Sequence, residues 1–179
     1  IIYEFSGEFL ESLSVLKRTK EVLDKIEWQP ETRADLNTHI KYLIWQGHIN
    51  YRLGNVFESE QQLKLALELN HNIDPDLKCI SYFCLGMLKA SQSEVADAIS
   101  LYKKSLDIQN HTGNTQSKSR ILHRLGMLKA SQGEVAEAML LYQQSLDIED
   151  CTNDFRGKAS TLHSISSLKV NQGEIEEAL

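Results

Sequence analysis

The sequence contains one segment twice, forty residues apart. Residues 85–108 read LGMLKASQSEVADAISLYKKSLDI and residues 125–148 read LGMLKASQGEVAEAMLLYQQSLDI, an offset of 125 − 85 = 40 residues. A repeat of this length is typical of small helical units that cannot bury their apolar faces alone and therefore stack on their neighbours. Such an array presents a long surface instead of a central pocket, so the repeat favours binding over catalysis.

The composition is that of a soluble folded protein. Of the 179 residues, 41% are hydrophobic and 25% are charged, and two prolines and nine glycines are too few for a loop-rich all-β protein. The net charge of −6 argues against non-specific binding to nucleic acid or to an anionic membrane, since both need a basic surface. No apolar run approaches the roughly eighteen residues that span a bilayer.

The cysteines and the two ends of the sequence indicate the setting of the protein. Cys79, Cys84 and Cys151 show no CxxC spacing and no pairing scheme, which favours a reducing compartment with the thiols acting as small buried apolar groups. We therefore expect a cytoplasmic protein. The sequence begins at Ile1 without an initiator Met and ends at Leu179 inside a repeat, so we expect it to be a piece of a longer protein.

Each repeat is predicted to consist of two amphipathic helices, A and B, joined by a short polar corner. In the third repeat, apolar residues recur near the helical period over 115–131 and 134–148. Gly133 at the corner can adopt the positive φ that ends a helix. The same frame predicts further helices at 9–26, 31–53, 76–91, 94–108 and 154–171, and one that follows the corner at 54–55 and runs to about residue 69.

These positions resemble the tetratricopeptide repeat (TPR) family. The family pattern has a Leu-Gly pair in helix A, a Gly at the corner, and a small, an aromatic and a second small residue in helix B. The matching residues are Leu125, Gly126, Gly133, Ala138, Tyr142 and Ser145 in the third repeat, and Leu85, Gly86, Ser93, Ala98, Tyr102 and Ser105 in the second. The period exceeds the usual one of about thirty-four residues and resembles the subclass found in bacterial signalling and scaffold proteins.

The resemblance implies an all-α fold, a right-handed α-solenoid (TPR superhelix) of stacked antiparallel helix pairs. We expect residues 1–179 to form a single solenoid, with Gly86 and Gly126 placed where helices A and B cross. Only a missing or very small side chain lets two helix axes approach to about 8–10 Å. The expected boundaries are 1–29 for a partial repeat, 31–73, 74–112 and 113–152 for three repeats, and 153–179 for a truncated fourth.

Helix A lines the inside of a TPR superhelix, so the positions opposite its core are predicted to bind the partner. Trp, Tyr and Arg are common anchors of protein interfaces. In an alternative interpretation, the apolar members merely pack against neighbouring repeats. The predicted partner-binding residues are Lys41, Trp45, His48, Tyr51, Phe83, Met87, Arg120, His123, Arg124, Met127 and His163.

Two pairs within this set have chemical interpretations of their own. Arg120 and Arg124 stand four residues apart on one helix face and could clamp a carboxylate or a phosphate, or they could be solvated or paired with acids of helix B. His123 and His163 share one repeat position and could face each other. They lack a third ligand, so no metal site is predicted, and they are interpreted as solvated histidines or as a pH-sensitive contact.

A ladder of lysines, Lys89, Lys129 and Lys169, recurs at the end of helix A. We interpret these lysines as amphipathic stems that cover apolar surface while the ammonium groups stay in water. The acids of the B helices are interpreted as a solvated outer stripe.

The sequence lacks the motifs of catalysis. It contains no phosphate-cradling glycine loop, no GxSxG elbow and no HExxH motif, so no enzyme activity, catalytic residue, metal or cofactor is predicted. We expect a protein-interaction module that binds a partner segment, or a neighbouring domain of the same protein, along a concave groove. The alternative is a ligand- or partner-sensing regulatory domain of a larger signalling ATPase or transcription activator. Neither interpretation involves nucleic acid or a membrane.

Overall fold

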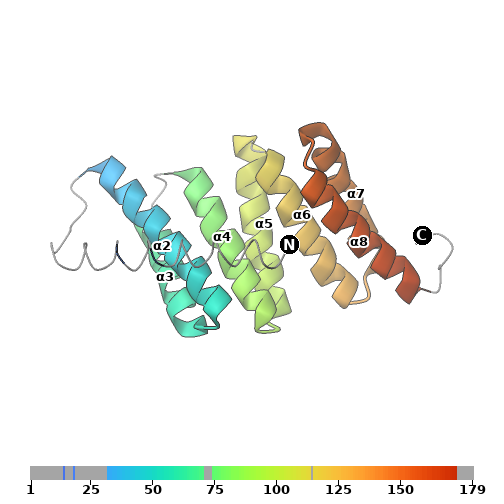
Figure 1. Cartoon of the computed structure of the whole chain (residues 1–179), viewed down its shortest axis with the longest axis horizontal. Coiled ribbons are helices and arrows are strands. Elements are labelled where there is room, and N and C mark those ends of the chain that lie inside the picture. Colours follow the sequence, from blue (N-terminus) through green and yellow to red (C-terminus); the bar gives the residue numbers. More distant parts are fainter. Residues whose placement is uncertain (1–13, 15–17, 19–31, 71–73, 114, 173–179) are drawn as a thin grey trace. The chain divides into compact units, whose positions relative to one another are not determined.

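The computed structural model describes residues 14, 18, 32–70, 74–113 and 115–172, and within these residues it contains helices and no strand (Figure 1). The predicted all-α fold is therefore confirmed over this part of the chain. Apart from residues 14 and 18, the helix expected at 9–26 lies outside the described residues, and so does the final corner at residue 173. The helices are α2 (Arg33–Leu53), α3 (Val56–Leu69), α4 (Pro75–Ser91), α5 (Val95–Thr112), α6 (Thr115–Ser131), α7 (Val135–Thr152) and α8 (Phe155–Asn171).

The chain divides into two compact units, Ile1–Cys84 and Leu85–Leu179, called unit 1 and unit 2 below. The boundary falls inside α4. In unit 1, α2 packs against α3. In unit 2, α6 packs against α5, α7 and α8, and α7 also packs against α8. Figure 1 shows α6 and α8 on the same side of unit 2, with α7 behind them.

The helix ends follow local capping chemistry. α2 begins with a capping box, in which the backbone N–H of Asp35 donates to Thr32 Oγ1 at 3.1 Å and that of Thr32 donates to Asp35 Oδ2 at 3.1 Å. α6 has the predicted bounds. α5 and α7 continue to Thr112 and Thr152, beyond the predicted ends at residues 108 and 148, because each stops only where Gly113 or Asn153 adopts a left-handed conformation.

Two glycines in helix A allow close packing against helix B, as predicted. A Cβ added at Gly126 would lie 2.7 Å from Tyr142 Cε1, and one added at Gly86 would lie 2.6 Å from Tyr102 Cε1. Both tyrosines are buried. The aromatic ring of helix B therefore occupies the space that a side chain of helix A would fill. The glycine of the Leu-Gly pair and the aromatic residue of helix B, two positions of the family pattern, thus contact one another.

The corners after α4 and after α6 are closed by ion pairs, which corrects the interpretation of Lys89 and Lys129. Lys129 Nζ lies 2.7 Å from Glu134 Oε2 and 3.0 Å from Glu137 Oε2, and Lys89 Nζ lies 3.0 Å from Glu94 Oε2. These ammonium groups therefore bind carboxylates across the corner instead of pointing only into water. The hydrogen bonds to Glu134 and then to Glu137 raise the pKa of Lys129.

The cysteine environments are mixed. Cys79 and Cys84 are buried, as expected, whereas Cys151 is exposed in the last turn of α7, so the expectation of a buried thiol was wrong there. None of the described helices has the length and apolar character needed to cross a bilayer.

Candidate functional site

Three aromatic side chains among the predicted site residues lie along α2. Trp45 is 59% exposed, and His48 and Tyr51 follow it at intervals of three residues. The ring centroids of Trp45 and His48 are 6.4 Å apart in an edge-to-face arrangement, and those of His48 and Tyr51 are 6.3 Å apart and stacked. We call these three residues the α2 aromatic row. Lys41 is exposed one turn before Trp45.

Trp45 is exposed and His48 and Tyr51 are half-buried, because the other face of α2 forms the core of unit 1. Ile40 and Leu43 are buried, and Gly47 lies so close to α3 that a Cβ on it would meet Leu63 Cγ at 2.7 Å. Ser59 of α3 donates a hydrogen bond to the Gly47 carbonyl oxygen at 2.7 Å. These contacts set the rotation of α2 about its axis, so the aromatic row is held on the outer side of the pair.

The two predicted site residues of α4, Phe83 and Met87, differ in their burial. Phe83 is only 9% exposed, so its prediction as a surface anchor was wrong, because the ring belongs to the apolar interior. Met87 is partly buried. The alternative interpretation, in which the apolar residues of this set pack in the interior, therefore describes Phe83 better.

In unit 2, one row of α6 carries Arg120, Arg124 and Met127. Arg120 and Met127 are exposed, Met127 by 41%, and Arg124 Nη1 lies 3.9 Å from Met127 Sδ, which is a weak acceptor. His163 is exposed on α8. The structure thus brings the two arginines and the methionine together on one helix, beside a second helix that presents a histidine.

His123 lies at the junction of three helices. Its Nε2 is 2.9 Å from Ser164 Oγ on α8, and its ring centroid is 5.7 Å from that of Tyr142 on α7. The hydrogen-bond partner on α8 is thus Ser164, the neighbour of the predicted His163. Burial, and then the charge of Arg124, lower the pKa of His123 to about 4. The interpretation of His123 as an ordinary solvated histidine was therefore wrong.

We expect His123 to remain neutral through the physiological pH range. Its pKa in the folded state lies below the ordinary value of 6.5, so the unfolded chain takes up the proton first and the folded state loses stability as the pH falls from about 6.5 to about 4. An NMR titration of the imidazole resonances, assigned with a His123→Gln variant, should show a midpoint near 4. A midpoint near 6.5 would contradict this placement of the ring.

Sequence reasoning missed a buried carboxyl at the contact between α7 and α8. Glu149 is only 2% exposed, and its Oε1 lies 3.0 Å from Ser145 Oγ and 3.1 Å from Thr161 Oγ1. Within the described part of the chain its Oε2 has no hydrogen-bond partner. Burial raises the pKa of Glu149, and the charges of Asp154 and Asp150 raise it further, against the hydrogen bonds from Ser145 and Thr161 that lower it.

One signal in the sequence could have identified this position. The residue forty positions earlier, Gln109, is buried as well, and it accepts a hydrogen bond from Thr112 Oγ1 at 3.2 Å. A glutamate and a glutamine at the same repeat position indicate a shared structural role for a long polar side chain. Neither residue lies among groups suited to metal binding, and no set of three His, Cys, Asp or Glu side chains in the described residues could hold a metal ion.

A comparison with known families covers the middle of the chain. Residues 76–149 match the family described as tetratricopeptide repeat. This span runs from the first turn of α4 to near the end of α7, and it contains the two copies of the internal repeat. No curated protein sequence matches the chain.

Solved structures extend the likeness to nearly the whole chain. BtubC from P. vanneervenii is similar with a TM-score of 0.72 and 15% identity, over 97% of this chain and 68% of that one. Aspartyl phosphate phosphatase F from Bacillus subtilis has a TM-score of 0.76 and 16% identity, over 95% of this chain and 46% of its own. A Podosopora anserina protein with nearly identical TPR-like repeats has a TM-score of 0.67 and 18% identity, over 98% and 84%.

At these identities the similarity shows the fold alone. It confirms the prediction of an all-α helical repeat of the TPR solenoid type. The name of the phosphatase transfers no activity to this chain, which spans less than half of that protein. Proteins of the tetratricopeptide repeat family generally bind other proteins and do not catalyse reactions.

Proposed function

We propose that this chain is a protein-interaction module, in which the first helix of each helix pair presents the binding surface to a partner protein or to another domain. Support comes from the family match over residues 76–149 and from the shared fold. In unit 1 the proposed surface is the α2 aromatic row with Lys41. In unit 2 it is the side that carries Arg120, Arg124 and Met127 on α6 and His163 on α8. Binding along a concave groove stays a prediction.

The observation that carries the proposal is the α2 aromatic row. Single exposed aromatic residues are normal on soluble proteins, as Phe57 on α3 shows with 70% exposure. Three rings at successive helical positions are a different feature, because each ring packs beside the next one. Side chains that are already ordered lose little conformational entropy when a partner covers them. Trp and Tyr are also the residues that most often dominate binding energy.

We expect Trp45→Ala to weaken partner binding by about tenfold or more, the effect of losing a central aromatic anchor. Because the indole is mostly exposed, the free energy of unfolding should change by less than about 0.5 kcal/mol. Partners would first be identified by affinity purification with quantitative mass spectrometry, and the affinity for the purified partner would then be measured by calorimetry.

Phe57→Ala is the matched control, because it removes an exposed aromatic ring from the second helix of the same pair. It should leave the affinity nearly unchanged. If Phe57→Ala abolished binding and Trp45→Ala did not, the partner would lie on α3 and the proposed surface would be wrong.

A further inference from the structure

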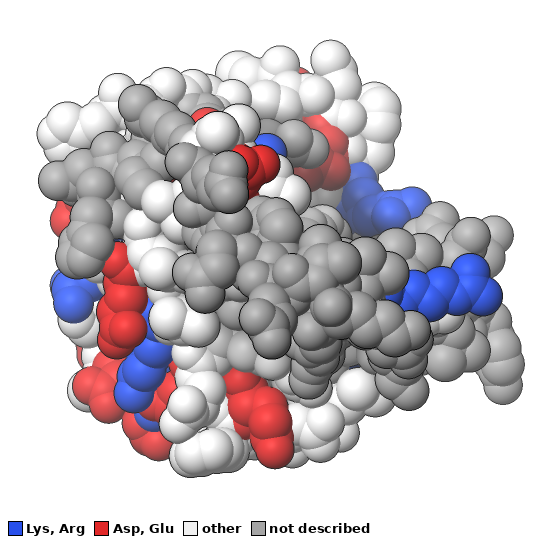
Figure 2. All heavy atoms as spheres, turned by 90° about the vertical axis from the view of Figure 1, so that its left-hand side faces the viewer, with Lys and Arg blue, Asp and Glu red and all other residues white. Residues whose placement is uncertain are grey.

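Glu149 is the only Asp, Glu, Lys or Arg side chain that is buried within the described residues. The usual place of such side chains is the surface, where Figure 2 shows several of both signs on the side of the molecule that faces the viewer. A buried carboxylate costs free energy unless it is paired and fully hydrogen-bonded. Glu149 lies where α8 packs against α7, so the charge of this one carboxyl group affects that contact.

Three side chains, Ser145, Glu149 and Thr161, form what we call the Glu149 cluster, in which groups from α6, α7 and α8 meet. Ser145 Oγ of α7 lies 2.8 Å from the uncharged Ser119 carbonyl oxygen of α6 and 3.0 Å from Glu149 Oε1. Thr161 Oγ1 of α8 lies 3.1 Å from the same Oε1. A protonated Glu149 can donate to Ser145, which in turn donates to the Ser119 carbonyl oxygen. Once Glu149 is ionised, the single hydroxyl proton of Ser145 serves only one of these two acceptors.

A second carboxyl group, that of Asp154, lies beside the cluster and caps α8, since its Oδ1 accepts the backbone N–H of Gly157 at 2.9 Å. A Cβ added at Gly157 would lie 2.8 Å from Asp154 Oδ2 and 2.9 Å from Glu149 Oε1, so the two carboxyl groups approach the same point. Burial raises the pKa of Glu149, and the charges of Asp154 and Asp150 raise it further, against the hydrogen bonds that lower it. Asp150 is itself paired with Lys158 of α8. Ionisation of Glu149 therefore places a second negative charge beside the residue that caps α8.

The corresponding contact between α5 and α6 has no ionisable side chain at these positions. Gln109 and Ile121 stand forty residues before Glu149 and Thr161, and both are buried. An amide stays neutral throughout the ordinary pH range. The same place in the repeat therefore contains an ionisable group between α7 and α8 and a neutral one between α5 and α6.

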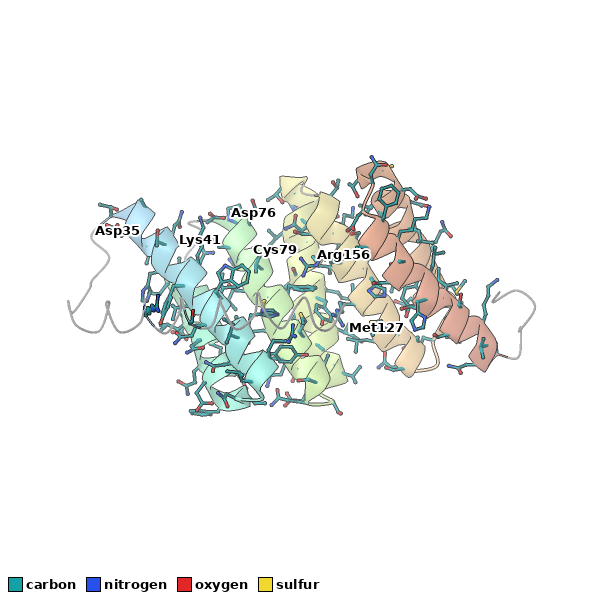
Figure 3. All side chains as sticks on the ribbon, viewed as in Figure 1. Asp35, Lys41, Asp76, Cys79, Met127 and Arg156 are labelled. Carbon is teal, nitrogen blue, oxygen red and sulfur yellow. The ribbon has the colours of Figure 1, made fainter. Side chains whose placement is uncertain are left out.

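We propose that the Glu149 cluster makes the packing of α8 depend on pH: α8 stays on α7 while Glu149 is protonated, and ionisation of Glu149 lets α8 detach locally. The ionised form leaves one acceptor without the Ser145 proton and sets Glu149 against Asp154, the N-cap of α8. Single helices can open in this way without global unfolding. Figure 3 labels Arg156 in the first turn of α8, which directly follows this cap.

The direction of the change follows from the raised pKa of Glu149. A group whose pKa is raised in the folded state contributes stability below its ordinary pKa, here 4.5, and this contribution is lost as the pH rises through the folded value. α8 should therefore be held most firmly in mild acid and should open more often toward alkaline pH. Because His163 lies on α8, opening would remove it from the surface proposed above. The inference goes beyond the proposed function, since it holds whatever the partner is.

Hydrogen exchange on the whole chain, measured by mass spectrometry from about pH 5 to about pH 9, tests the proposal without any variant. After division by the intrinsic exchange rate at each pH, the protection of the α8 amides should fall by about tenfold, the effect of leaving one buried polar group unsatisfied. At alkaline pH it should also be at least about tenfold lower than the protection of α5, because α8 then opens while α5 stays folded. Constant protection of α8, or protection equal to that of α5 at alkaline pH, would overturn the proposal.

The variant Glu149→Gln should abolish the pH dependence of α8 protection, because an amide does not ionise. The control Asp147→Asn removes a carboxylate from an exposed position of the same helix, and it should keep the fall of about tenfold seen in the parent protein. If α8 lost protection with rising pH in Glu149→Gln as it does in the parent, or if both variants abolished the loss, Glu149 would not be the responsible group and the proposal would be wrong.

Discussion

Replacing Gly126 by leucine is expected to lower the free energy of unfolding by about 3 kcal/mol, at the upper end of the cost of overfilling a packed core. The first added carbon alone would lie 2.7 Å from Tyr142 Cε1, and three more carbons would follow it. The ring cannot move away easily, since Tyr142 is 2% exposed and packs with Ala138 and Leu168. The better helix propensity of leucine, about 1 kcal/mol, offsets only part of this cost.

Chemical denaturation followed by circular dichroism would measure this loss. Ala136→Leu adds a larger side chain at an exposed position of α7 and should change the free energy of unfolding by less than about 0.5 kcal/mol. In a Tyr142→Ala background, the cost of Gly126→Leu should largely disappear, because the space of the ring is then empty. An undiminished cost in that background would show that Tyr142 is not what excludes a side chain at position 126.

The second large effect is expected from Glu149→Gln, which should stabilise the protein by roughly 1–3 kcal/mol at alkaline pH, the range for a buried polar group left unsatisfied. The Ser145 hydroxyl has one proton and lies 2.8 Å from the Ser119 carbonyl oxygen and 3.0 Å from Glu149 Oε1, so it cannot donate to both. An amide at position 149 can donate to Ser145 instead. Gln109, buried at the same repeat position, shows that the fold accepts this side chain.

The pH dependence of this effect has a defined sign. Because the pKa of Glu149 is raised in the folded state, the folded protein holds the proton more tightly than the unfolded chain does. Its contribution to stability is therefore fully present below the ordinary pKa of about 4.5 and is lost as the pH rises through the folded pKa. The Glu149→Gln variant has no ionisable group at this position. The difference in the free energy of unfolding between the variant and the parent protein should therefore grow as the pH rises and vanish near pH 4.

Thermal unfolding across pH would test this dependence. Asp107→Asn removes the same charge from an exposed position of α5 and separates the effect of burial from that of net charge. A Glu149→Gln variant that is less stable than the parent protein at alkaline pH would contradict the account, because it would mean that the ionised carboxylate is favourable where it lies.

Helix bounds and corners were predictable because their causes are local. The apolar period and the corner glycine predicted α6 at its observed bounds, and Gly133 has the positive φ expected of it. The ends of α5 and α7 were less accurate, because polar residues after position 108 or 148 resemble a connector. In the structure these polar residues continue the helix. The observed ends lie where Gly113 and Asn153 adopt the left-handed backbone conformation.

The candidate site was predictable to the level of a helix face and not to the level of each side chain. Trp45 was placed on the face of α2 opposite the core, and it is exposed, whereas Phe83 was assigned by the same register and is buried. His123 was assigned to the surface, and its ring contacts Tyr142 and Ser164. A side chain at the edge of a helix face is exposed or buried depending on how the neighbouring helix packs. The register of a single helix does not contain this information.

The sequence by itself determined that this chain forms paired helices, where most of them begin and end, and which glycines lie where helices A and B cross. These features depend on periodicity, capping and the size of single residues, which act within one helix or one repeated pair. Only the tertiary structure decided which polar groups are buried, as Glu149 and His123 show. Burial depends on the packing of a third helix, α8, and that contact is made between residues of different repeats.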